Sequence, residues 1–345
     1  MTDAGPRPPI PPVPEGEPRP LWSVMVPTYQ SSRWLGETLE SVLRQDPGAS
    51  AMQIEVVDDA SGDDPAAVVA AVAGNRVAFS RQPENRGHVA TFNECLRRAR
   101  GRLVHLLHGD DQVRPGFYLS MARAFELRPD AGAAFCRQVH QDGDGRVHGL
   151  SPLERAESGV LEGWLETIAE GQRLQAVAMV VRRDVYERLG GFDRRIHAYG
   201  EDWEMWVRIA AHYPVWYEPE PLAVYRVHAR SLSAGVLRTG RNVRDLSRVI
   251  DLNRALLPSG RAAAITRRAR SACARAALRR GRRMLKANDF RGPLAQAREA
   301  VRCRPTPDVV ARAAILVGHW AARGLRLALA RRTVSVSPDS RTAGG

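Results

Sequence analysis

Strand-like and helix-like segments alternate along the first part of the chain, and this alternation limits the fold more than any other feature. "WSVMVPTY" is a β-branched run that ends in a proline turn, and "WLGETLESVLRQ" then carries apolar residues at helical spacing. The same order recurs as "QIEVVDDASGDD" with "PAAVVAAVAG", "RVAFSRQ" with "HVATFNECLRRARG", and "RLVHLLHGDD" with "GFYLSMARAFELRPD". Such βα units predict an α/β fold, with a Rossmann-like, mostly parallel sheet flanked by helices and ligand sites at the carboxyl ends of the strands.

Polar side chains follow the first two predicted strands. Pro27, Thr28 and Tyr29 come after the first strand, where an aromatic face and a hydroxyl suit a nucleotide base. Asp58 and Asp59 come after the second strand, and a carboxylate there can accept hydrogen bonds from a base imide or a ribose hydroxyl. Taken alone, "DDASGDD" more commonly caps a helix, so capping is the alternative for these two acids.

Two adjacent carboxylates, Asp110 and Asp111, follow the strand-like run "RLVHLL". Adjacent acids repel each other, so solvent or a cation must offset their charge. The sequence contains neither GxGxxG nor GxxxxGKS, so a metal would have to offset part of the charge of any bound phosphates. Mn²⁺ or Mg²⁺ prefers such oxygen donors, and the pair is predicted to bind metal and ribose. A solvated turn is the alternative.

A second acidic pair opens a predicted helix in "AYGEDWEMWVRIA". Apolar residues recur at helical spacing from Trp203 to Ala210, so Glu201 and Asp202 fall in the first turn, where the helix dipole favours negative charge. Helix capping is one role for them. The other is catalytic, because an acceptor hydroxyl is a poor nucleophile until a carboxylate takes its proton.

Five segments occur in an order that resembles the family 2 glycosyltransferases of the GT-A fold. They are "VMVPTYQSSRWLGETLESVLRQ", "IEVVDDASGDD", "ENRGHVATFNECLRRARGRLVHLLHGDD", "LGGFDRRIHAYGEDWEMWVRIA" and "YRVHARSLS". The resemblance covers about residues 21 to 232. It implies a metal-assisted, inverting enzyme of bacterial cell-surface polysaccharide biosynthesis. Such an enzyme moves a sugar from a UDP-, GDP- or dTDP-linked donor to a saccharide, lipid-linked or other acceptor hydroxyl.

The resemblance also implies contacts to the donor. Pro27, Tyr29 and Asp59 are similar to nucleoside contacts of the family. The turn "ENRGHVATFN" has backbone amides available to a donor, although a helix cap fits it equally well. The full set of expected substrate-binding residues is Pro27, Thr28, Tyr29, Asp58, Asp59, Arg86, Gly87, Asn93 and Asp110.

The resemblance also implies the residues that bind the metal. Asp110 and Asp111 are similar to the DxD element, but His108 stands where the family often has an acid, so the metal is expected mainly on Asp111, with Asp110 on the ribose. His228 in "YRVHARSLS" is expected to complete the metal or diphosphate site, since neutral imidazole binds Mn²⁺; a lone surface histidine is the alternative.

The implied general base is Asp202, with Glu201 as the weaker candidate. A single base opposite the leaving diphosphate permits one in-line displacement. Such a displacement inverts the anomeric configuration and needs no covalent intermediate.

Charge divides the chain into two bodies. Residues 231–345 carry 25 basic and 6 acidic side chains, whereas residues 1–230 carry 26 and 32. We predict a disordered, proline-rich leader over 1–20, a catalytic domain over 21–232, and an arginine-rich helical region over 233–345 with a disordered end. No CxxC spacing links the four cysteines, which predicts reduced, buried thiols in a cytoplasmic protein.

The basic C-terminal region has two expected roles. "AAILVGHWAA" is too short to cross a bilayer, which takes roughly 20 apolar residues. A helical cap packed on the catalytic domain is the first expectation. The second is an arginine-flanked helix on an anionic membrane surface, which would make the protein peripheral at the inner face of the membrane.

Two other classes compete with a glycosyltransferase. The pI of 10.6 suggests a nucleic-acid- or membrane-surface-binding protein with a non-catalytic nucleotide-binding domain. Because the charge is confined to the C-terminal region and aromatic residues are not interleaved with the arginines, we expect no specific nucleic-acid partner. A glycoside hydrolase also uses two carboxylates, but it would need neither a nucleotide pocket nor a metal.

Overall fold

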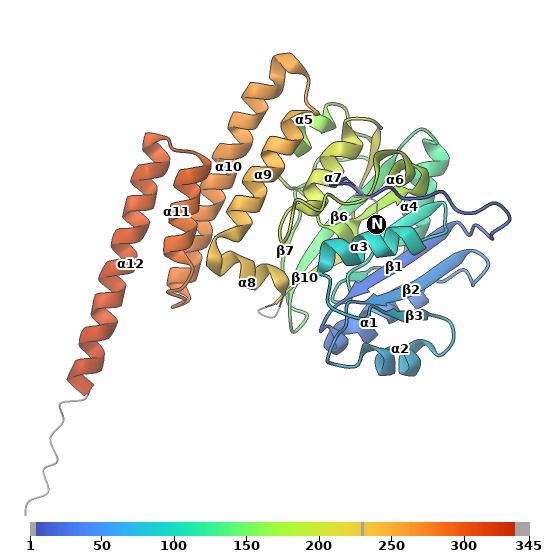
Figure 1. Ribbon diagram of the computed structural model, residues 1–345, viewed down its shortest axis with the longest axis horizontal. Helices are drawn as coiled ribbons and strands as arrows, with labels where there is room; N and C mark the ends of the chain where they lie inside the picture. The colour runs from blue at the N-terminus through green and yellow to red at the C-terminus, as the bar shows by residue number, and fades with distance from the viewer. Residues whose placement is uncertain (1–4, 229–230, 335–345) are drawn as a thin grey trace, which may run out of the picture.

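A computed structural model describes residues 5–228 and 231–334 of the chain (Figure 1). An α/β domain lies on one side of the molecule and a group of C-terminal helices lies on the other. The α/β domain is built on a sheet with the strand order β3-β2-β1-β4-β9-β6-β10-β5.

One half of the sheet is parallel. It consists of β1 (Trp22–Thr28), β2 (Met52–Asp58), β3 (Ala78–Arg81) and β4 (Leu103–Leu106). These strands are the four that the repeated βα units predict. Their carboxyl ends meet at one edge, which brings the polar residues after β1, β2 and β4 together.

The other half of the sheet is mixed. β9 (Met179–Arg182) is antiparallel to both β4 and β6 (Ala133–Asp142), so β6 points the same way as β4. β10 (Val215–Val227) is parallel to β6 and therefore continues that direction. The predicted mostly parallel sheet is confirmed. Three short antiparallel strands complete it: β5 (Gln112–Val113), β7 (Val147–Leu150) and β8 (Gly159–Val160).

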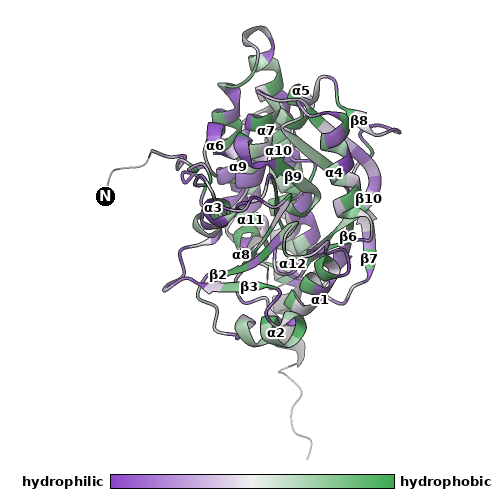
Figure 2. Cartoon of the chain, turned by 90° about the vertical axis from the view of Figure 1, so that its right-hand side faces the viewer, coloured by the Kyte–Doolittle hydropathy of each residue, from purple (hydrophilic) through white to green (hydrophobic). Residues whose placement is uncertain are grey.

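Helices cover both faces of the sheet. Alternate residues of β1 join different hydrophobic clusters: Val24 and Val26 pack with the cluster around α1, and Met25 packs with the cluster around α3 and α7. Figure 2 shows hydrophobic residues on the central strands and hydrophilic residues on the surrounding loops. The helices of this domain are α1 (Ser32–Leu43), α2 (Pro65–Ala73), α3 (His88–Arg98), α4 (Phe117–Leu127), α5 (Trp164–Ala169), α6 (Arg183–Leu189) and α7 (Glu201–Ala210).

The C-terminal helices share a core with the α/β domain. Leu246, Val249 and Ile265 belong to the same hydrophobic cluster as the inner face of α7. Arg261 and Arg268 add ion pairs to Glu166 and Glu170 of the α5 segment, with distances of 2.5 and 2.7 Å. The helices are α8 (Leu232–Thr239), α9 (Arg241–Arg254), α10 (Ser259–Lys286), α11 (Pro293–Cys303) and α12 (Pro307–Val334).

The structure corrects the prediction of a disordered leader for residues 5–20, which run along the α/β domain, while residues 1–4 of that prediction lie outside the described residues. Ile10 is only 4% exposed and joins the core cluster, while the carbonyls of Pro6 and Pro8 accept hydrogen bonds from Arg194 and Gly191. Proline richness excludes regular helix and sheet, but it does not prevent an extended segment from packing through its carbonyls and side chains.

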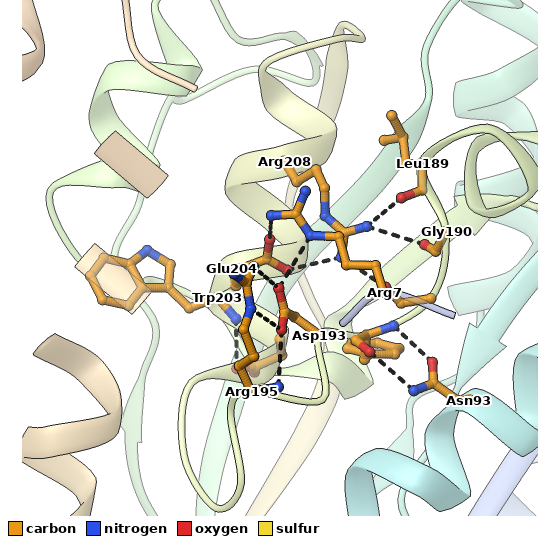
Figure 3. A network of polar contacts seen from close by, with 12 residues as sticks. Arg7, Asn93, Leu189, Gly190, Asp193, Arg195, Trp203, Glu204 and Arg208 are labelled. Atoms are coloured by element: carbon orange, nitrogen blue, oxygen red, sulfur yellow. Dashed lines mark hydrogen bonds and ion pairs between the residues drawn. The ribbon is translucent and has the colours of Figure 1, made fainter. Parts of the chain in front are cut away.

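Arg7 ties this N-terminal segment to buried acids (Figure 3). Its guanidinium lies 2.7 Å from Glu204 and 3.3 Å from Asp193, and both carboxylates are fully buried. Arg208 and Arg195 pair with the same two acids. Burying an unpaired carboxylate is unfavourable in free energy. The ion pairs of Arg7 therefore hold the N-terminal segment against α7.

The prediction of buried cysteines without a disulfide is confirmed, because all four lie among the described residues, are buried and are free.

Candidate active site

A cavity of 570 Å³ opens where the carboxyl ends of β1 and β4 meet the start of α7. Nine of the residues predicted for the site line it. They are Pro27, Thr28, Tyr29, Asp59, Gly87, Asp110, Glu201, Asp202 and His228. Residues from both halves of the sheet, 201 positions apart at the extremes, therefore share one cavity.

The turn that carries the aspartate pair lies tightly against the end of β1. A Cβ atom at Gly109 would lie 2.6 Å from Ser31 Oγ and 2.7 Å from Thr28 Oγ1, so only glycine allows this approach. The turn leaves Asp110 half-buried at the cavity wall and Asp111 fully buried behind it. One oxygen of Asp111, Oδ1, accepts a 2.8 Å hydrogen bond from the backbone N–H of Arg226.

The other oxygen of Asp111, Oδ2, is buried without a hydrogen-bond partner. Nδ1 of His108 lies 3.6 Å from it. Burial, and secondarily the neighbouring Asp110, raises the pKa of Asp111 well above its usual range. A native protein rarely leaves such an atom unpaired unless a ligand completes it.

A divalent cation fits these residues. Ligand atoms of His108, Asp110 and Asp111 all lie within 4.8 Å of one another, and carboxylate oxygens with one imidazole nitrogen suit Mn²⁺ or Mg²⁺. His228 was expected among the ligands, but in the described residues His108 lies in that group instead. His228 Nε2 lies 2.9 Å from Asp110 Oδ2, so it orients that carboxylate.

Trp34 of α1 holds His228 in place. The two rings lie 4.0 Å apart between centroids, and the guanidinium of Arg226 lies 5.8 Å from the same indole. Arg226 also pairs with Glu37 at 2.6 Å and donates to the carbonyl of Asp110 at 2.9 Å. Contacts from α1 and β10 therefore position His228 and the Asp110 turn.

The second acidic pair begins α7. Gly200 has φ +91°, a left-handed conformation that favours glycine and that turns the chain into the helix. Asp202 accepts two hydrogen bonds from Gln172 Nε2, at 2.9 and 2.8 Å, and one from the backbone N–H of Trp203 at 2.7 Å. Glu201 Oε1 lies 3.3 Å from His88 Nε2, and its Oε2 has no partner.

The environments of these two acids move their pKa values in opposite directions. Burial and the adjacent Glu201 raise the pKa of Asp202 to about 8. Burial alone would raise the pKa of Glu201 as well, but His88 opposes burial and the net shift is downward. Glu201 is therefore the ionised member of the pair near neutral pH, and Asp202 is the member that exchanges a proton.

Asp59 organises the predicted donor loop. Its carboxylate accepts hydrogen bonds from the backbone N–H groups of Arg86 and Gly87, at 2.8 and 2.9 Å, and from Gln82 Nε2 at 3.0 Å. The carboxylate lines the cavity while it holds the start of α3 in place. Binding and capping are thus compatible at this position.

Three predicted substrate contacts lie outside the cavity wall. Asp58 uses its buried carboxylate on Arg81 and on the backbone N–H of Ser61, which closes a turn, whereas the helix that follows is capped by Asp64. Asn93 uses both ends of its amide on the backbone of Phe192, at 3.0 and 2.7 Å (Figure 3). The side chain of Arg86 points to solvent, and only its backbone takes part. Polar side chains near strand ends and helix starts also hold loops and neighbouring backbone, and Asp58 and Asn93 are used in that way.

Several cavity residues had no sequence signal. Gln172 lies in a stretch without a motif, and His197, Tyr199 and Arg241 also line the wall. Arg241 belongs to α9, so the C-terminal helices contribute directly to the site. Only "HAYGED", a polar run before a helix, marked the position of His197 and Tyr199.

The fold is similar to that of solved GT-A glycosyltransferases. S. aureus TarS in complex with UDP superposes with a TM-score of 0.58 at 16% identity, covering 83% of this chain and 92% of that one. The mannosyltransferase PcManGT from Pyrobaculum calidifontis, in complex with GDP-Man and Mn²⁺, superposes with a TM-score of 0.51 at 20% identity, covering 92% and 90%. At these identities the likeness shows the GT-A-like fold.

The family follows from the sequence comparisons. The model of Glycosyl transferase family 2 matches residues 23–190. A protein of Mycobacterium tuberculosis (strain CDC 1551 / Oshkosh), named uncharacterized protein MT1568, is 32% identical over 243 residues, which are 67% of this chain and 75% of that protein. The chain belongs to glycosyl transferase family 2, and it is a glycosyltransferase.

Proposed function

We propose that this glycosyltransferase moves a sugar from a nucleoside diphosphate donor to an acceptor hydroxyl in one inverting displacement. The observation that carries the proposal is the presence of two unsatisfied acidic groups at one cavity, Glu201 in its wall and Asp111 directly behind Asp110. Asp111 Oδ2 and Glu201 Oε2 are both buried without partners, one in the His108–Asp110–Asp111 group and the other beside Asp202. Such an arrangement suits a cation with a diphosphate at one end and an acceptor at the other.

The donor lies, in this proposal, along the ends of β1, β2 and β4. Tyr29 is half exposed at the rim, where its ring can stack on a base, and Thr28 and Asp59 line the wall below it. The solved GT-A structures named above contain UDP or GDP-Man, which supports a nucleoside diphosphate here.

His108, Asp110 and Asp111 would hold the divalent cation. When bound, such a cation offsets the charge of the diphosphate and of the leaving group. The chain's own contribution is to fix the ligands: Arg226 N–H holds Asp111, and His228 holds Asp110. His108 also stacks on Phe92 with centroids 5.1 Å apart, which limits its rotation.

Asp202 is the proposed general base. It takes the proton of the acceptor hydroxyl while that oxygen forms a bond to the anomeric carbon and the bond from this carbon to the diphosphate breaks. Gln172 donates to both of its oxygens, which orients the carboxylate and stabilises its ionised form. Glu201, held near His88, stays ionised and raises the affinity of Asp202 for the proton.

The test of this function is a donor screen with the full chain. Purified protein is incubated with UDP-, GDP- and dTDP-linked sugars, Mn²⁺ or Mg²⁺, and a set of saccharide and lipid-linked acceptors. We expect nucleoside diphosphate release that depends on both metal and acceptor, with one donor preferred at least about tenfold in kcat/KM. Release of nucleoside monophosphate, or no turnover with any donor while the protein hydrolyses simple glycosides, would contradict the proposal.

A further inference from the structure

A basic groove lies between α10 and α12, at the outer edge of the C-terminal helices and away from the cavity of the α/β domain (Figure 1). It has a volume of 890 Å³. Its basic side chains are Arg279, Arg282, Arg283, Lys286, Arg323 and Arg326.

The arginines of α10 differ along the helix. In its first half, Arg261, Arg268 and Arg270 pair with carboxylates of neighbouring elements. In its last two turns the groove side chains are exposed, and within the part of the chain that the structure describes no carboxylate lies within ion-pair distance of them. Arginine-rich composition alone does not explain this separation, because the paired arginines join neighbouring elements, whereas among the groove side chains only Arg323 has a hydrogen-bond partner in the described residues, the amide oxygen of Asn288.

The free side of α12 is apolar. No charged residue occurs from Ala313 to Ala322, yet Ile315 and Leu325 are 51% and 63% exposed, and Val310 and Val317 are exposed as well. Exposed apolar side chains on a helix that borders a basic groove are typical of an interaction surface. No helix among the described residues is long and apolar enough to cross a membrane.

We propose that the groove and the exposed side of α12 dock this enzyme on an anionic lipid bilayer. Guanidinium groups bind lipid phosphates and carboxylates, and the apolar side chains of α12 enter the boundary between headgroups and acyl chains. Charge and apolar exposure occur together on this surface, and a bilayer matches both, whereas a nucleic acid matches only the charge. The inference rests on these helices alone and holds whichever donor the catalytic cavity binds.

The experiment measures cosedimentation of the full chain with vesicles. One set contains phosphatidylcholine only, and the other contains phosphatidylcholine with phosphatidylglycerol. The groove variant R279Q/R282Q/R326Q removes three unpaired charges from the groove. The matched control R244Q/R254Q/R267Q removes three exposed arginines of α9 and α10 that line neither cavity.

We expect the wild type to bind only the anionic vesicles and to be released by salt, because the attraction is screened within a Debye length of about 10 Å at 0.1 M. The groove variant is expected to lose about 100-fold in partition, since each basic side chain at the surface contributes about fivefold. The control is expected to lose less than about threefold, and both variants should keep wild-type transfer to a soluble acceptor.

Three outcomes would overturn the proposal. One is equal binding of the wild type to neutral and anionic vesicles, and another is an equal loss in the two variants. The third is tighter binding to duplex DNA than to anionic vesicles at the same salt, which would assign the groove to nucleic acid. A circular dichroism spectrum for each variant shows that α10 and α12 remain folded.

Discussion

Asp202→Asn is expected to lower kcat for sugar transfer by about 10²–10⁴-fold and to leave donor binding near the wild-type value. Asparagine keeps the size of the side chain and can still accept the hydrogen bond from Gln172, but it cannot take a proton. Asparagine is also about as good as aspartate near a helix N-terminus, so a capping residue would tolerate the exchange. Steady-state transfer, together with calorimetric binding of the nucleoside diphosphate and metal, separates the two roles. A variant within about threefold of wild-type kcat would remove the proposed base.

The pH profile gives the same experiment a second readout. The pKa of Asp202 is raised to about 8, so the base is mostly protonated at neutral pH and wild-type kcat should rise with pH until about 8. Asp202→Asn should lose that rise. Glu201→Gln removes the charge that helps to raise this pKa, so the rise should move to lower pH while kcat falls less than in Asp202→Asn.

As pH rises from about 4 to about 8, the free energy of unfolding should fall while kcat rises. Because the folded pKa of Asp202 lies above its unfolded value of 3.8, the folded protein holds a proton that the unfolded chain releases between these pH values. Wild-type stability from this group is therefore lost as pH rises from about 4 to about 8. Asp202→Asn avoids that loss, so at about pH 9 its free energy of unfolding, measured by denaturant titration, is expected to exceed that of the wild type by about 1–3 kcal/mol.

Asp111→Asn is expected to reduce transfer by at least about 100-fold and to weaken donor binding in Mn²⁺ or Mg²⁺. The asparagine oxygen can keep the hydrogen bond from Arg226 N–H, so the turn stays in place while the charge at Oδ2 is lost. Excess chelator should produce the same loss in the wild type. A matched control is Asp58→Asn, since that buried carboxylate is used on Arg81 and Ser61 and lies outside the cavity.

The chelator result decides the role of the metal. If the wild type keeps full turnover in excess EDTA, the three-residue group does not act through a divalent cation. If Asp58→Asn loses turnover as completely as Asp111→Asn, the effect of Asp111 comes from folding rather than from charge at the site. Melting temperatures for both variants measure that contribution directly.

The sequence was sufficient for the parallel half of the sheet and for the residues at its edge. The spacing of apolar residues shows where the βα units lie, and the carboxyl ends of their parallel strands meet at one edge of the sheet. Tyr29, Asp59 and Asp110 could therefore be assigned to one site from the sequence. Asp202 could be assigned to the same site because it lies at the start of a predicted helix that is rich in tryptophan. Each of these residues follows a regular element whose position the pattern predicts.

Other features could not be predicted from the sequence. Gln172 reaches Asp202 from a loop with no periodicity, and Arg241 reaches the cavity from α9, which is packed there by core contacts far along the chain. Asn93 was expected to bind the donor, but its amide donates to the backbone carbonyl of Phe192. A polar residue after a predicted turn fits either partner, so the sequence could not distinguish them. Arg7 was assigned to a disordered leader because its partners, Asp193 and Glu204, are almost 200 residues away.

The most direct test of the proposed mechanism is the stereochemistry of the product. The experiment uses a donor identified in the screen. Proton NMR measures the coupling constant of the anomeric proton in the donor and in the product. One displacement with Asp202 as base predicts that an α-linked donor gives only a β-linked product at the earliest time points. A product that keeps the α configuration would contradict a single displacement and require a covalent or front-face route.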